Sequence, residues 1–102
     1  MKAIYKKPGE DAELIDVEDE LEVFQHLVGG WIEPVLLPGG VIAIVNEEGR
    51  INGMELNMYF PGIQLFGPIV FVGEDPDDLE NWTDCPMDLD EFEDCCGGCI
   101  YG

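Results

Sequence analysis

Apolar residues recur in the first third of the chain at the spacing of a helix. Four of them fall at i, i+4, i+7 and i+11, on one helical face, namely Val17, Leu21, Phe24 and Val28. We therefore predict a helix over residues 17–28. Asp16 is the expected N-cap, because its carboxylate can accept a hydrogen bond from the first turn. Gly29-Gly30 is the expected stop, since glycine readily adopts the left-handed conformation that ends a helix.

Short apolar or β-branched runs between turn residues predict the strands. They are residues 2–5, 12–16, 31–37, 41–45 and 64–73. The first two runs flank the turn residues Pro8-Gly9, so a hairpin is expected there. Pro34 indicates an edge strand, because proline cannot donate to a sheet ladder. The continuous β-branched run at 41–45 indicates a central strand that is buried on both faces.

The periodicity is less regular in the rest of the chain. Residues 50–62 have no clean period, and we predict a loop with a short helical turn. Gly67-Pro68 is expected to kink the last strand. Apolar residues spaced i, i+3 and i+7 predict a short helix over residues 88–96, capped near Asp88 and ended by Gly97-Gly98.

These elements predict an α+β domain in which a small, mainly antiparallel sheet packs against one main helix. The core domain is expected over residues 1–73. Residues 74–102 are expected to form an acidic, cysteine-containing C-terminal segment that either belongs to the same domain or is partly disordered. The aromatic side chains, Trp31 and Tyr59 among them, are candidates for lining a pocket, although at their spacing most are expected in the core. Trp82 is the exception, because it lies among acids.

Charge changes this picture most. The 102 residues include 23 acidic and 4 basic side chains, for a net charge of −19. Residues 10–22 hold eight acids and residues 74–94 hold eleven, with no base in either segment. Such a balance argues against binding nucleic acid or anionic lipid through charge. No apolar run reaches the ~20 residues of a membrane span, and the first ten residues do not resemble a signal peptide, so we expect a cytoplasmic protein.

The density of this charge decides between two roles. A globule of this size has an accessible surface of about 5,700 Å², or roughly one net charge per 300 Å². Duplex DNA carries roughly one per 100 Å². The surface can therefore imitate DNA only if residues 10–22 and 74–94 meet on one face. Otherwise the charge simply keeps a small domain soluble.

Three stretches of the chain resemble a known family. They are the opening Met1–Gly9, the helix end Val28-Gly29-Gly30-Trp31-Ile32-Glu33, and Val41–Gly49 followed by Asn57. Gly67-Pro68 before the last apolar run also fits. Over about residues 1–73 the chain resembles the family of the domain of unknown function 3846. The resemblance implies a short protein of bacteria, phages or other mobile elements, and it supplies no functional residues.

The residues that commonly carry catalysis or metal binding are few. The candidate metal ligands are Cys85, Cys95, Cys96 and Cys99, but their C-x9-C-C-x2-C spacing lacks two separated C-x2-C pairs. We expect free thiols, no metal and no cofactor; a redox pair at Cys96 and Cys99 is the alternative. The chain has no serine and one histidine, His26, which excludes a Ser-His-Asp site. No enzyme chemistry is identified.

Two binding functions follow. The first is a small acidic binding protein of phage or mobile-element type that engages a basic host-protein surface, such as one that binds nucleic acid. Its predicted contact residues are Asp75, Asp77, Asp78, Glu80, Trp82, Asp84, Glu18, Asp19 and Glu22. The second is a module for a small molecule or nucleotide, with a neutral pocket near Asn46–Phe60. The scarcity of bases counts against a phosphate ligand there.

Overall fold

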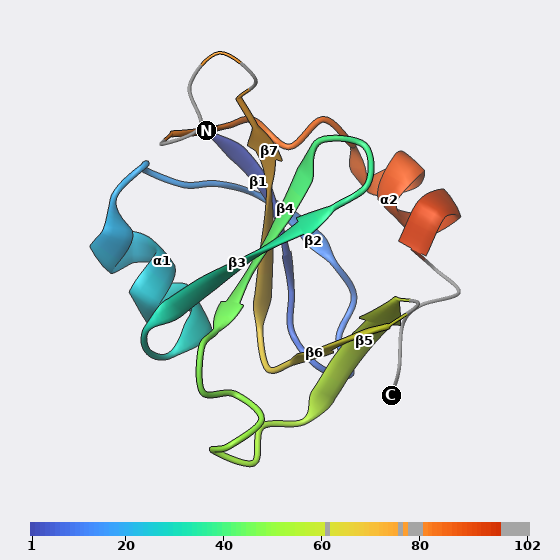
Figure 1. Cartoon of the computed structure of the whole chain (residues 1–102). Helices are drawn as coiled ribbons and strands as arrows, with labels where there is room; N and C mark the ends of the chain where they lie inside the picture. Colours follow the sequence, from blue (N-terminus) through green and yellow to red (C-terminus); the bar gives the residue numbers. More distant parts are fainter. Residues whose placement is uncertain (61, 76, 78–80, 97–102) are drawn as a thin grey trace.

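A six-stranded antiparallel sheet runs through the centre of the molecule (Figure 1). The structure is a computed structural model, and it describes residues 1–60, 62–75, 77 and 81–96, without the side chains of residues 95 and 96. The strand order is β2-β1-β7-β4-β3, with β8 also paired to β7. The strands are β1 (Lys2–Lys6), β2 (Glu13–Asp16), β3 (Ile32–Leu37), β4 (Val41–Asn46), β7 (Ile69–Glu74) and β8 (Trp82–Thr83).

The most apolar strands occupy the middle of this sheet. Every residue of β4 and the first five residues of β7 are buried. Both faces of these strands are covered, which is why their sequences run apolar without alternation. β3 pairs only with β4 and forms an edge, so the expectation drawn from Pro34 is confirmed. The predicted hairpin of β1 and β2 is confirmed as well.

Helix α1 (Leu21–Val28) covers one face of the sheet. It begins four residues later than predicted, with Glu20 as the N-cap and no side-chain capping bond. Asp16 does not cap it, because that residue ends β2 and its carboxylate binds the N-terminal ammonium instead. The predicted stop is confirmed, since Gly29 caps the helix in the left-handed conformation.

The apolar face of α1 is narrower than the sequence pattern predicts. Phe24 and Val28 are buried against Ile44 and Val70 of the sheet. Val17 is also buried, but it lies in the loop before the helix. Leu21 is 54% exposed, which corrects its assignment to the core. Leu21 keeps the helical spacing with Phe24 and Val28, but it stands in the first turn and lines a small hollow at the surface instead of the core.

The opposite face is covered by a hairpin and a second helix. They are β5 (Leu56–Phe60), β6 (Ile63–Phe66) and α2 (Leu89–Cys96). Met58, Leu65 and Phe92 are fully or almost fully buried in a cluster with Phe71 and Ile4. The molecule therefore has three layers, with α1 on one side of the sheet and the hairpin and α2 on the other (Figure 1).

The hairpin corrects the predicted loop at residues 50–62. A register shift between Leu56 and Met58 and the buried amide of Asn57 interrupt the alternation that would have revealed β5. The predicted last strand, 64–73, is in fact two strands in different sheets. Gly67, with φ +76°, makes the break between β6 and β7, so the position of the irregularity was predicted but not its extent.

The predicted C-terminal helix is confirmed in α2. The Glu91 N–H donates to Asp88 Oδ1 at 2.8 Å, which is the expected cap. Phe92 packs against Phe71 with ring centroids 5.0 Å apart, joining α2 to the core. The predicted stop at Gly97-Gly98 lies outside the described residues. No helix in the described ranges is long and apolar enough to cross a membrane.

Candidate functional site

Acids from both acidic segments surround the N-terminus of the chain. The Met1 ammonium donates to Asp16 Oδ1 at 2.9 Å and to the Val17 carbonyl at 3.0 Å. The Lys2 N–H donates to Asp84 Oδ1 at 2.8 Å. The hydrogen bond that the ammonium donates to Asp16 and the negative charges of Asp16, Asp84 and Asp19 raise the pKa of the ammonium. Asp84 of the second segment therefore lies beside Asp16 and Asp19 of the first, at the start of the first strand.

We call this surface the N-terminal acidic face. Its members are Asp16, Glu18, Asp19, Glu20 and Asp84. All but Asp84 line a shallow basin of about 570 Å³ beside Met1. Two ion pairs are formed between described residues, Met1–Asp16 and Lys7–Glu10. Of these two pairs, only Met1–Asp16 lies on this face, and its cation is the N-terminal ammonium.

Trp82 joins the second acidic segment to α1. Its ring lies edge-on to that of Phe24, with centroids 5.1 Å apart. The two rings, together with Asp19, Leu21 and Ile32, line a small hollow of about 150 Å³. Trp82 is half-buried, so it holds β8 against the core and also presents an apolar surface beside an acid.

Two of the other predicted contact residues, Glu22 and Asp75, belong to the described part of the chain. Glu22 is exposed in the first turn of α1. Asp75 follows β7 and accepts a hydrogen bond from the Asp77 N–H at 2.9 Å, forming a local turn. Asp78 and Glu80 lie outside the described residues. The structure thus brings Glu18, Asp19 and Asp84 together near the N-terminus.

A buried lysine marks a second meeting of the two segments. Lys6 is only 1% exposed, and its Nζ donates to the Lys7 carbonyl at 2.9 Å and to Asn57 Oδ1 at 3.1 Å. Burial lowers the pKa of Lys6, while Asp11, Glu10 and Glu93 oppose that shift. These acids come from the β1–β2 turn and from α2, so the segments approach each other here too.

Asn57 connects this lysine to the hairpin. Its Nδ2 donates to the carbonyls of Lys6 and Gly67, both at 2.8 Å, and the residue is fully buried. The amide thereby donates hydrogen bonds to the carbonyl at the end of β1 and to the carbonyl at the start of the β6–β7 link. This contact explains why a polar residue occupies the core, and its role is structural.

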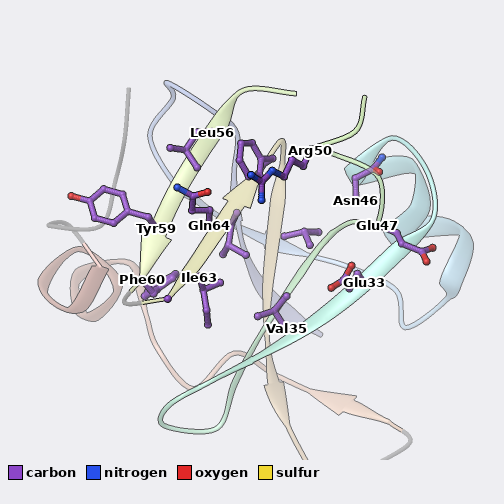
Figure 2. A pocket seen from close by; sticks show the side chains of 14 residues that line it. Glu33, Val35, Asn46, Glu47, Arg50, Leu56, Tyr59, Phe60, Ile63 and Gln64 are labelled. Atoms are coloured by element: carbon purple, nitrogen blue, oxygen red, sulfur yellow. The ribbon is translucent and has the colours of Figure 1, made fainter. Parts of the chain in front are cut away.

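An open groove of about 940 Å³ lies between β3 and the β5–β6 hairpin (Figure 2). One side holds Glu33, Val35 and Glu47, and the hairpin side holds Phe60 and Ile63. Its further lining residues are Val45, Asn46, Arg50, Leu56, Tyr59, Gly62, Gln64, Leu65 and Phe66. The groove overlaps the stretch Asn46–Phe60, where the sequence predicted a neutral pocket, but Glu33, Glu47 and Arg50 give it charged walls.

The sequence pattern did not predict every part of this groove. Tyr59, which lies within the predicted pocket, is 45% exposed at the groove, whereas Trp31 is 67% exposed outside both the core and the groove. The hairpin that forms one wall was predicted as loop. Asn46, the first residue of the predicted pocket, is used structurally, since its Nδ2 donates to the Val28 carbonyl and its Oδ1 accepts from the Glu48 N–H.

The cysteines are not gathered into a site among the described residues. Cys85 is a half-buried free thiol beside the core, and burial raises its pKa. A raised pKa leaves little thiolate at neutral pH. The side chains of Cys95 and Cys96, and all of Cys99, lie outside what the structure describes. Within the described part, no three His, Cys, Asp or Glu side chains are grouped as a metal ion would require.

The fold and its surfaces define a small α+β domain with an acidic face and an open groove. Comparison with known families matches residues 1–96 to the family described as Domain of unknown function (DUF3846). The chain belongs to this family, and the match extends through α2, beyond the residues that carry the resemblance in the sequence. No curated protein and no solved structure matches the chain.

Proposed function

We propose that this protein is a binding protein of phage or mobile-element type that engages a basic surface of a host protein. The surface it would cover is one that otherwise binds nucleic acid. The observation that carries the proposal is the meeting of the two acidic segments at the N-terminal acidic face. The position of Asp84 beside the first segment supports the proposal, because imitation of a nucleic acid requires acids of both segments on one face.

The charge of this face is directed outward. Glu18, Asp19 and Glu20 are exposed, and no described base forms an ion pair with them. Unpaired carboxylates on one face produce a negative potential that attracts and orients a basic partner. Binding of this type weakens as salt rises, because the exposed charges are screened.

The hollow beside Trp82 adds an apolar contact to the charged face. A lysine or arginine side chain can lay its aliphatic part on Trp82 while its charge meets Asp19. Aromatic side chains in such positions are frequent centres of binding energy. The proposal therefore assigns Trp82 and Asp19 to the same contact with the partner.

A capture experiment tests the proposal. The tagged full chain is incubated with bacterial lysate at low and at high salt, with and without duplex DNA. We expect enrichment of a DNA-handling protein that both salt and DNA displace. A charge-reversed variant, Glu18→Lys/Asp19→Lys, is expected to lose this protein.

The matched control is Glu48→Lys/Glu55→Lys, which changes the net charge equally at exposed positions outside the acidic face. It is expected to retain most of the capture. Equal loss in both variants would show that total charge, not this face, drives the interaction. Failure of the wild-type chain to enrich any DNA-handling protein would contradict the proposal outright.

A second candidate function is a binding module for a small molecule or nucleotide, and the groove is the surface that would carry it. Its volume lies at the upper end of the ~300–1,000 Å³ typical of ligand sites, and several apolar side chains line it. A thermal-shift screen with nucleotides and neutral metabolites tests this candidate. A stabilising compound whose effect disappears in Tyr59→Ser supports it; a screen without any shift contradicts it. We propose no catalytic role for either surface.

A further inference from the structure

We propose that the groove between β3 and the β5–β6 hairpin binds an extended, cationic and amphipathic peptide segment. Its basic side chains meet Glu33 and Glu47, and its apolar side chains lie on Val35 and Ile63. The inference shares only the basic character of the partner with the first proposed function. It concerns a different surface and stands or falls separately.

The shape of the groove favours a chain segment over a small ligand. A small molecule typically has ~70–90% of its surface enclosed by its pocket. This groove is open, with β3 on one side and the hairpin on the other (Figure 2). A peptide lying along the groove can fill about 940 Å³ without enclosure, since its backbone can remain hydrated.

The charges of the groove select the sign of the ligand. Glu33 and Glu47 are both exposed, and neither forms an ion pair with a described base. Arg50, the only base that lines the groove, lies over the Phe66 ring with its guanidinium carbon 5.9 Å from the centroid. Two free carboxylates and a net charge of −19 favour a cation and disfavour a phosphate.

The edge of β3 limits how such a peptide is held. The Glu47 N–H donates to the Trp31 carbonyl, so alternate residues from Trp31 onward bond to β4. The backbone groups of Ile32, Pro34 and Leu36 therefore face the free edge. Pro34 has no N–H to offer, which interrupts any strand added there. Side-chain contacts in the groove, not strand addition, must carry the binding.

Fluorescence anisotropy with defined peptides tests the inference on the full chain. The probe is a fluorescein-labelled peptide of about eight residues that alternates lysine and leucine. We expect it to bind at least about tenfold more tightly than an equally charged peptide that alternates lysine and serine. A glutamate–leucine peptide is expected not to bind.

Two double variants locate the site. Glu33→Lys/Glu47→Lys is expected to weaken binding at least about tenfold, and Glu18→Lys/Asp19→Lys at most about twofold. Both remove the same charge from exposed positions, so thermal melts serve as the folding control. Equal losses, or no preference for leucine over serine, would overturn the inference. Capture of the host protein would then still test the first proposed function independently.

Discussion

At the scale of single residues, the buried contact between Lys6 and Asn57 is unusual, because a charged side chain lies inside the core. The lysine ammonium is buried with a carbonyl and an amide oxygen as partners, although 23 acidic residues are present in the chain. Asn57 returns two hydrogen bonds to backbone carbonyls. One amide thereby holds the end of β1, the hairpin and the β6–β7 link together.

Replacing Asn57 by alanine tests this contact. Asn57→Ala removes an acceptor from Lys6 and a donor from two carbonyls, so we expect the free energy of unfolding to fall by about 3 kcal/mol. Urea unfolding measures the change. Asn52→Ala, at an exposed position, is the control and is expected to stay within about 0.5 kcal/mol of wild type. Similar losses in both variants would refute the role given to Asn57.

Lys6 also predicts a dependence of stability on pH. Because burial lowers its pKa, the unfolded chain binds more protons than the native chain between that lowered value and the ordinary 10.5. Stability from this group therefore rises with pH across that window. The unfolding free energy of wild type minus that of Lys6→Met should therefore increase from pH 7 to pH 10. A flat or falling difference, measured in urea at each pH, would contradict the assignment.

At the scale of elements, α1 lacks a side-chain cap. Glu20 occupies the N-cap position with φ −130° and ψ 135°, but its side chain makes no capping bond. Glu20→Ser provides a side-chain oxygen that can cap the helix, and we expect the free energy of unfolding to rise by about 1 kcal/mol. Glu20→Ala removes the same charge without adding a cap, so it is the matched control. Equal thermal melts for the two variants would argue against a free cap position.

Gly73 allows β8 to approach the sheet. A Cβ at this position would meet the Asp84 carbonyl oxygen and, at 3.0 Å, the Thr83 methyl group. We expect Gly73→Ala to lower the free energy of unfolding by about 2 kcal/mol and to weaken the pairing of β8 with β7. In a Trp31→Phe background, the emission of Trp82 should shift to the red. Gly53 has open space around it but φ +74°, so Gly53→Ala strains a loop outside β8, and unchanged Trp82 emission in that variant is the control.

The elements differ in how far the sequence could reveal them. β4 and β7 could be predicted from the sequence because their apolar runs are long and uninterrupted. The β5–β6 hairpin was not, since the buried Asn57 and a register shift break the alternation of period two. The start of α1 was predicted too early because Val17, a buried residue of the loop before the helix, continues the helical spacing. Local periodicity cannot tell burial in a loop from burial on a helix.

At the scale of the whole molecule, the charges are arranged by the fold. Residues 10–22 and 74–94 are far apart in sequence, and the pairing of β8 with β7 brings Asp84 beside β1. The sequence stated the condition for a DNA-like face but could not show whether it is met. The groove likewise depends on the hairpin covering one face of the sheet, a contact that no local pattern encodes.

The most direct test of the central proposal is release of DNA. Labelled duplex DNA is bound to the DNA-handling protein captured from lysate, and its anisotropy is followed as this chain is added. The account predicts that the wild-type chain and Glu48→Lys/Glu55→Lys release the DNA, whereas Glu18→Lys/Asp19→Lys does not. A complex that holds both DNA and this chain, with no release, would contradict it.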